Sequence, residues 1–232
     1  MWRGIFRWTW RLLLLALIAL TLLQFWFLVH VWYWTTHNPQ TTAFMRYRLE
    51  SKREEAPHAV LQHRWVPYER ISAHLKRAII AAEDGKFTKH SGFDWESMRA
   101  AHDKNVREGE IVSGGSTITQ QLAKNLFLPP ERAWWRKAQE AAITVMIEAV
   151  MDKRRILEIY LNVVEWGDGV FGAEAAARYH FGTSAAALSP EQAARLAVML
   201  PSPRRYGPGA STPYLQRRAG IILRRMGAAA AP

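Results

Sequence analysis

An unbroken apolar segment near the N-terminus is the strongest constraint on how this chain can fold. Residues 12–34 contain no Asp, Glu, Lys or Arg, and only Thr21, Gln24 and His30 interrupt the apolar residues. As a helix, the segment is long enough to cross the ~30 Å hydrocarbon core of a bilayer. We therefore predict one transmembrane helix over these residues.

The residues that flank this segment predict its orientation. Arg3, Arg7 and Arg11 precede it with no acidic residue among them, so the positive-inside tendency places the N-terminus in the cytoplasm and the rest of the chain outside. Tryptophans lie at both ends, where amphipathic rings prefer the membrane interfaces. A cleaved signal peptide is the alternative, but the apolar run is too long and no small-residue cleavage site follows it.

Composition limits the class of partner. The chain has 232 residues, of which 49% are hydrophobic, and a net charge of +11. Nucleic acid, anionic lipid headgroups or a pyrophosphate substrate would all suit that charge. A membrane anchor, and the lack of any helix-turn-helix, zinc-finger or RNA-binding signature, argue against nucleic acid. The absence of cysteine excludes thiol catalysis and cysteine metal sites, and no His-Glu-x-x-His spacing predicts a metal site.

Helical spacing dominates the outward part of the chain. After a polar segment, apolar residues recur at helical spacing from Tyr68 onward, and further helices are predicted over about 153–163, 172–180, 189–200 and 213–226. Ser189, Pro190 and Gln192 form a typical helix start. No alternating run predicts a sheet. The predicted divisions are a cytoplasmic N-terminus (1–11), the transmembrane helix (12–34), a stalk (35–64), one domain (65–227) and a tail (228–232).

The pair Glu83-Asp84 is the first candidate for chemistry. Glu83 follows Ile79 by four residues at the end of a predicted helix, so its carboxylate lies at the edge of the apolar face. Poor solvation and the partial negative charge of a helix C-terminus both favour the protonated form and raise the pKa. A raised pKa suits a general base. The alternative is a solvated carboxylate pair that merely ends a helix.

A junction between a turn and a helix is the second candidate. Residues 114–125 are Gly-Gly-Ser-Thr-Ile-Thr-Gln-Gln-Leu-Ala-Lys-Asn. Gly115 allows close backbone approach, Thr117 and Gln120 have the spacing of a capping box, and the N-terminal amides of a helix attract negative charge. The segment therefore predicts a site for an anionic, hydrogen-bonding ligand, although a plain capped helix start is common.

An ion pair at helical spacing is the third candidate. Arg136 and Glu140 are one turn apart and share a stripe with Ile143 and Ile147, which directs the pair toward the interior or a cleft. A purely structural ion pair is the alternative. Other cations close in sequence could meet a multiply charged anion, namely Lys124, Arg132 and Lys137.

Together these segments resemble the signatures of the peptidoglycan glycosyltransferases, family 51. The first signature, Glu-Asp-x-x-Phe-x-x-His-x-Gly, is matched at every defined position by Glu83, Asp84, Phe87, His90 and Gly92. Residues 114–125 match the second and residues 136–140 the third, while residues 153–162 and 169–182 resemble the fourth and fifth. His180 stands where Tyr or Phe is common. Because no transpeptidase domain follows, the chain resembles the monofunctional form.

This resemblance implies a reaction. The family polymerises lipid II, a disaccharide-pentapeptide joined through pyrophosphate to a polyprenyl lipid, into glycan strands. Glu83 is the implied base for the acceptor 4-hydroxyl, and Lys124 and Arg132 would stabilise the departing diphosphate as the α-linkage inverts to a β-1,4 glycoside. Glu140 is the second implied catalytic carboxylate, which orients the cations or a divalent ion.

The resemblance also implies roles for other residues of the signatures. The implied substrate-binding residues are Asp84, Ser116, Thr117, Gln120, Gln121, Lys124, Asn125, Arg132, Arg136 and Lys137. The implied structural residues are Phe87, His90, Gly92, Gly115, Tyr160 and Asn162. Residues 94–112 would line the cleft and touch lipid.

The implied fold is an all-α, lysozyme-like domain with a small membrane-proximal lobe. The implied location is the outer, periplasmic face of the cytoplasmic (inner) membrane. Lipid II, the growing strand, membrane lipid and other cell-wall synthesis and division proteins are the expected partners, with no nucleic acid. No cofactor is required with certainty, and Mg²⁺ or Mn²⁺ at the diphosphate stays open, since Mg²⁺ is often held by one or two carboxylates plus phosphates.

Two other functions remain as alternatives. A lysozyme-like peptidoglycan hydrolase or lytic transglycosylase would use an acidic Glu to protonate a leaving sugar oxygen, and needs no cations for a diphosphate. The cations between Lys124 and Lys137 argue against that function. A membrane-anchored cell-wall scaffold is the other alternative, and the intact Glu83 and Glu140 argue against an inactive enzyme.

Overall fold

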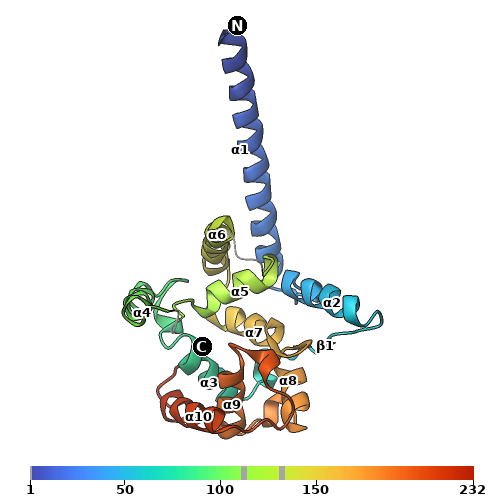
Figure 1. Ribbon diagram of the computed structural model, residues 1–232, viewed down its shortest axis with the longest axis vertical. Helices are drawn as coiled ribbons and strands as arrows, with labels where there is room; N and C mark the ends of the chain where they lie inside the picture. Colours follow the sequence, from blue (N-terminus) through green and yellow to red (C-terminus); the bar gives the residue numbers. More distant parts are fainter. Residues whose placement is uncertain (1, 111–113, 131–133) are drawn as a thin grey trace.

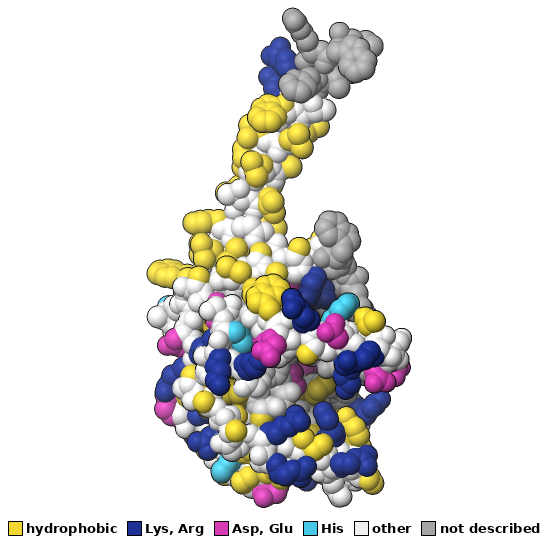
Figure 2. All heavy atoms as spheres, turned by 90° about the vertical axis from the view of Figure 1, so that its left-hand side faces the viewer, with side chains coloured by type: hydrophobic (Ala, Val, Ile, Leu, Met, Phe, Trp, Pro, Cys, Tyr) yellow, Lys and Arg dark blue, Asp and Glu magenta, His cyan; other side chains and the backbone are white. Residues whose placement is uncertain are grey.

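The structure is a computed structural model that describes residues 2–110, 114–130 and 134–232. A long helix, α1 (Trp2–Tyr33), projects from a helical domain formed by the rest of the chain (Figure 1). Within it, Arg7–Tyr33 is long and apolar enough to cross a membrane. Figure 2 shows hydrophobic side chains along this stem and at its base. The predicted apolar helix is therefore present, as a single-pass anchor requires.

The domain is almost entirely helical, which confirms the predicted all-α class. Its helices are α2 (Ala43–Glu55), α3 (Ala73–Glu83), α4 (Trp95–Glu108), α5 (Ile118–Phe127), α6 (Trp134–Val150), α7 (Lys153–Val163), α8 (Ala173–Phe181), α9 (Pro190–Met199) and α10 (Pro213–Met226). Short 3₁₀ turns cover Tyr68–Arg70, Phe87–Lys89, Ala185–Ala187 and Pro203–Arg205.

A small sheet, which the sequence did not predict, completes the fold. It consists of β1 (Gln62–His63), β2 (Glu165–Gly167) and β3 (Val170–Phe171) in the order β1-β3-β2. β1 runs parallel to β3, and β2 runs antiparallel to β3 with an irregular register. Strands this short contain too few residues to display an alternating pattern.

Local sequence signals set several helix boundaries. The helices predicted over about 153–163, 172–180, 189–200 and 213–226 correspond to α7, α8, α9 and α10. At the start of α9, the Ser189 hydroxyl accepts from the amide of Gln192, and the Gln192 side chain accepts from the amide of Ser189. This capping box, with Pro190 at the first helical position, confirms the predicted start.

Helix α7 lies at the centre of the domain. It packs against α5 and α8, and in Figure 1 it lies between the part nearest α1 and the part farthest from it. Its buried residues are Ile156, Leu157, Ile159, Tyr160, Leu161, Asn162 and Val163. A helix that is buried on nearly every side is a core helix. Helices α3, α9 and α10 pack on one another at the end of the domain opposite α1.

The last turns of α1 are packed onto the domain. Phe27 is buried, and its ring centroid lies 5.1 Å from that of Phe127 at the end of α5. Gln24 and Gln139 of α6 exchange side-chain hydrogen bonds of 2.9 and 3.1 Å. Just beyond α1, the backbone oxygen of Trp34 accepts from Nε of Arg155 at 2.9 Å. The last turns of the apolar helix thus contact α5 and α6, and the residue that follows the helix contacts α7.

The segment predicted as a polar stalk, residues 35–64, contains α2 and β1, which both belong to the domain. Arg48 of α2 is buried, and its guanidinium pairs with Glu165 at 3.1 Å and with Asp168 at 2.6 Å. Lys52 also pairs with Asp168. In the sequence, the charged residues of α2 look like those of a solvated helix, because the residues with which they pair, Glu165 and Asp168, lie more than 100 positions further along the chain.

A glycine substitution tests the packing beside the sheet. Gly172 has φ +83°, and a Cβ there would lie 2.7 Å from the backbone oxygen of Asn162. We expect Gly172→Ala to destabilise the protein by about 2 kcal/mol or more, because both the backbone conformation and the contact become unfavourable. That corresponds to a fall in Tm of about 4–8 °C for a chain of this size.

Thermal unfolding of the full-length protein in detergent measures this effect. Gly227→Ala is the matched control, because Gly227 has φ −62° and a Cβ there meets nothing within 4 Å. Equal Tm values for the two variants would contradict the prediction.

Candidate active site

Glu83 lies where three helices meet. It is the last residue of α3, and its Oε2 accepts a hydrogen bond of 2.7 Å from Nε2 of Gln121 in α5. The hydroxyl of Tyr160 in α7 in turn donates to Oε1 of Gln121 at 2.8 Å. The carboxylate of Glu83 is therefore fixed by a chain of hydrogen bonds from the core helix.

The environment of Glu83 raises its pKa, as the sequence predicted. Burial is the main cause, and the negative charge of Asp84 adds to it. The hydrogen bond from Gln121 and the positive charge of Lys124 act in the opposite direction and lower the pKa. A raised pKa makes the carboxylate of Glu83 a better proton acceptor, which suits a general base.

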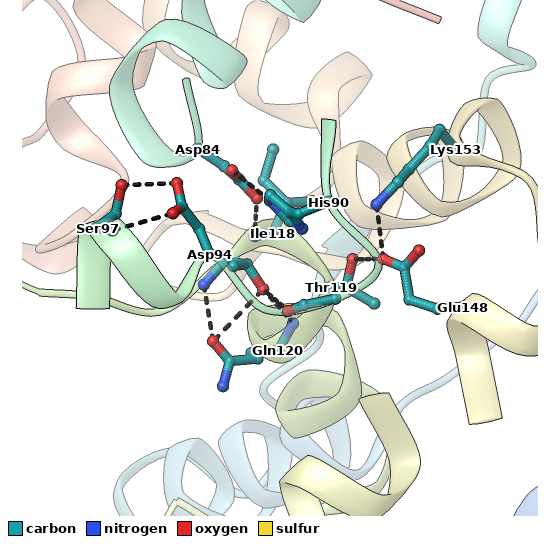
Figure 3. Close-up of polar contacts among 11 residues, drawn as sticks. Asp84, His90, Asp94, Ser97, Ile118, Thr119, Gln120, Glu148 and Lys153 are labelled. Carbon is teal, nitrogen blue, oxygen red and sulfur yellow. Dashed lines mark hydrogen bonds and ion pairs between the residues drawn. The ribbon is translucent and has the colours of Figure 1, made fainter. Parts of the chain in front are cut away.

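Asp84 connects the end of α3 to the start of α5 (Figure 3). Its side chain is 1% exposed, and its Oδ1 accepts from Nε2 of His90 at 2.9 Å. Its Oδ2 accepts from the backbone amide of Ile118, the first residue of α5, at 3.0 Å. Both oxygens of Asp84 therefore have protein partners, and the contact with His90 is consistent with a structural role for that histidine. The implied substrate contact of Asp84 stays a prediction.

The start of α5 has the predicted capping box. The Thr117 hydroxyl accepts from the amide of Gln120 at 3.2 Å, and Oε1 of Gln120 accepts from the amide of Thr117 at 3.0 Å. The same hydroxyl donates to the backbone oxygen of Gly92 at 2.7 Å. Thr117 and Gln120 are 2% and 1% exposed. These contacts fix both residues at the start of α5, and their implied substrate binding stays a prediction.

Gly92 of the first signature and Gly115 of the second are required by close contacts. Gly92 has φ +87°, and a Cβ there would lie 2.7 Å from Cγ2 of Thr144 in α6. A Cβ on Gly115 would lie 3.0 Å from the Cα of Met98 in α4. Larger residues would push the loops away from these helices, so both glycines position the loops around Glu83.

The remaining structural residues of the signatures hold the helices together. Phe87 is fully buried in the core. The side chain of Asn162 donates to the backbone oxygen of Val66 and accepts from its amide, both at 2.9 Å. Figure 3 also shows Glu148 of α6 between Thr119, which donates to it at 2.5 Å, and Lys153, at 2.8 Å. The fourth signature, which begins at Lys153, thus contributes contacts between elements, and its structural role stays a prediction.

A pocket with fixed cations lies on one side of Glu83. This Lys124 pocket has a volume of about 360 Å³ and is lined by Gln121, Lys124, Asn125, Tyr160, Arg48, Glu165 and Arg204, among others. Burial lowers the pKa of Lys124, and the charges of Arg136 and Lys137 lower it too, while Glu140 and Glu83 raise it. Sequence patterns did not single out Arg48, Glu165 or Arg204, because these residues come from α2, β2 and a 3₁₀ turn far apart in the chain.

A second pocket lies on the other side. This Ser116 pocket has a volume of about 430 Å³, and Glu83, Lys104, Ser116 and Arg225 are among its lining residues. Ser116 is exposed, so its hydroxyl is available to a ligand. Since Glu83 lines the Ser116 pocket and hydrogen-bonds to Gln121 of the Lys124 pocket, it lies between the two.

The predicted ion pair on α6 is present. Glu140 is 4% exposed, and its Oε2 lies 3.5 Å from Nη1 of Arg136, while Lys137 pairs with its Oε1. Among the residues that the structure describes, Nε and Nη1 of Arg136 are buried without a hydrogen-bond partner. Arg132, the other predicted cation, lies outside the described residues.

The described part of the chain contains no dedicated group of metal ligands. No cluster of three or more His, Cys, Asp or Glu side chains there could hold a metal ion. A divalent ion carried by the diphosphate itself stays a prediction.

Comparison with known proteins agrees with this geometry. The family model described as Transglycosylase matches residues 52–227. A protein of Nitrosospira multiformis is 55% identical over 226 residues, covering 97% of this chain and 98% of its own. A protein of Azoarcus sp. is 58% identical over 230 residues (99% of each chain), and one of Herminiimonas arsenicoxydans is 58% identical over 221 residues (95% and 96%). All three are named biosynthetic peptidoglycan transglycosylase. The chain therefore belongs to the transglycosylase family.

Proposed function

We propose that the protein polymerises lipid II into glycan strands with release of polyprenyl diphosphate. The observation that carries this proposal is the position of Glu83, a carboxylate with a raised pKa between a cation-lined pocket and a second pocket. The names of the similar proteins support it. A hydrolase would need no cluster such as Lys124, Arg136 and Lys137, so the geometry favours transfer over cleavage.

The two pockets suit the two substrates of such a transfer. The donor's diphosphate belongs in the Lys124 pocket, whose cations offset its charge. The acceptor's 4-hydroxyl reaches Glu83 from the Ser116 pocket. Glu83 takes the hydroxyl proton as the oxygen bonds to the donor's anomeric carbon. The bond from that carbon to the diphosphate oxygen breaks on the opposite face, which inverts the configuration, and Lys124 stabilises the departing charge.

Gln121 and Tyr160 orient the proposed base. Burial and the neighbouring Glu83 and Asp84 raise the pKa of Tyr160 well above its ordinary value, so the phenol keeps its proton. The protonated hydroxyl donates to Oε1 of Gln121. An amide whose oxygen is engaged in this way must turn its NH₂ group toward Glu83, since an amide has one acceptor end and one donor end. These contacts fix the carboxylate in the direction of the pockets.

The anchor suits a lipid-linked substrate. Helix α2, which follows α1, lines the Lys124 pocket with Phe44, Tyr47 and Arg48, so this pocket lies on the membrane side of the domain. A diphosphate held at the bilayer surface by its lipid can enter there. We propose that the N-terminus is cytoplasmic and the domain lies on the outer face of the cytoplasmic membrane, consistent with the arginines that precede the apolar segment.

Two further contacts remain proposals. Helix α4 exposes Trp95 and Val106, at 69% and 66%, which suits the predicted contact of residues 94–112 with lipid. Residues 111–112 lie outside the described part of the chain. Association with other cell-wall synthesis and division proteins is expected of such an enzyme.

Substitution of the proposed base tests the function. We expect Glu83→Gln to lower kcat for polymerisation of labelled lipid II by about 10²- to 10⁴-fold, because the amide cannot accept the proton. The assay uses full-length protein in detergent, with moenomycin, the family's donor-site inhibitor, in a parallel reaction. Glu55→Gln, at the exposed end of α2 and outside the lining of both pockets, is the control and should retain activity. Strand shortening without polymerisation by the wild type would favour the hydrolase instead.

The pH profile tests the role of Gln121. Since Glu83 must be ionised to act as base, activity should rise as pH rises through its pKa. The hydrogen bond from Gln121 favours the ionised form and lowers this pKa. We therefore expect Gln121→Leu to raise the pKa of Glu83 and to move the acidic limb of kcat/KM to higher pH. General damage to the site would lower the plateau without moving the limb, and that result would count against the assignment.

A further inference from the structure

Helix α10 carries a concentration of unpaired positive charge. It contains Arg217, Arg218, Arg224 and Arg225 and no acidic residue. Within the described part of the chain, none of these arginines pairs with a carboxylate. Compensation of the helix dipole accounts for cations in the last turn, which includes Arg224 and Arg225, but not for those in the middle of the helix.

Two of the four arginines of α10, Arg218 and Arg225, face the active site. Tyr214, Arg218, Ile221 and Arg225 follow the spacing i, i+4, i+7, i+11, which puts them on one face of α10. All four line a pocket of about 100 Å³ together with Glu83. We call Tyr214, Arg218 and Arg225 the arginine stripe.

The arginine stripe is continuous with the Ser116 pocket. Arg225 lines both that pocket and the smaller one, and Glu83 does the same. Arg217 and Arg224, on the neighbouring face of the helix, line neither. A ligand that reaches Glu83 through the Ser116 pocket therefore passes beside Arg225 and can extend toward Arg218.

The position of α10 excludes lipid headgroups as the anions. Figure 1 shows α10 at the end of the domain opposite α1. Figure 2 shows Lys and Arg side chains over much of the domain, its lower part included, and mainly hydrophobic side chains along the stem. Because α1 is the segment that suits the bilayer, the membrane surface lies at the other end. The arginine stripe is therefore available to an anion on the water-soluble part of a ligand.

The substrate of the proposed function, on which this inference rests, offers one such anion. Its sugars are uncharged at the reacting positions, and its diphosphate stays with the lipid at the membrane. Its peptide stem ends in a carboxylate and projects into water. Guanidinium groups bind carboxylates through paired N–H donors, and the hydroxyl of Tyr214 can add a further hydrogen bond. We propose that Arg218 and Arg225 bind the carboxylates of the acceptor's peptide stem beside Glu83.

Such a contact holds the acceptor without touching the reacting atoms. Its loss should therefore raise KM for the acceptor and leave kcat nearly unchanged. Because the arginines are exposed, the effect should weaken as salt concentration rises.

A charge-matched pair of double variants tests the assignment. Full-length R218Q/R225Q is compared with R217Q/R224Q, which removes the same charge from the same helix outside the pockets. Each is assayed on lipid II with free stem carboxylates and on lipid II with these carboxylates converted to amides. On the free-acid substrate we expect R218Q/R225Q to raise KM about three- to tenfold, the range for a pair of exposed ionic contacts, and the control to stay within about twofold.

The amidated substrate gives the decisive comparison. If the stripe binds carboxylates, wild type and both variants should have the same KM for it. Equal KM values for the two variants on the free-acid substrate, or an equal loss by R218Q/R225Q on both substrates, would overturn the assignment while wild-type polymerisation upholds the proposed function. A wild type that makes no polymer would instead overturn the proposed function, and this assignment with it.

Discussion

The hydrogen bonds of Asp84 are the interaction on which the rest of the site depends. A buried carboxylate at the end of α3 accepts the first backbone amide of α5, where the helix dipole favours negative charge, and also holds His90. This junction fixes the end of one helix against the start of another. Gln121, one turn into α5, consequently meets Glu83. Removal of this carboxylate would leave buried donors unpaired and release both helices.

Around that junction, the charges alternate in sign. Lys124 lies under the influence of both Glu83 and Glu140, and Glu140 is paired with Arg136 and Lys137. Each buried charge thus has an opposite charge close by, which offsets the cost of removing it from water. The same arrangement gives the proposed reaction its parts, because a carboxylate with a raised pKa stands next to cations able to stabilise a leaving diphosphate.

The two ends of the domain serve different parts of an amphiphilic substrate. At one end, α1 packs on α5 and α6, the helices that carry Lys124 and Glu140, so the anchor lies close to the Lys124 pocket. At the other end, α10 presents arginines far from the bilayer. A molecule with a lipid, a diphosphate and a peptide stem would find a matching surface along this axis.

The sequence by itself determined the features that depend on neighbouring residues. These were the apolar helix, the boundaries of α7 to α10, the capping box of Thr117 and Gln120, the ion pair of Arg136 with Glu140, and the position of Glu83 at a helix end. Spacing of a few residues fixes all of them. Only the tertiary structure decided the contacts of Asp84 and Gln121, the incorporation of α2 through Arg48, and the pockets near Glu83. Their partners lie far along the chain, and only packing brings them together.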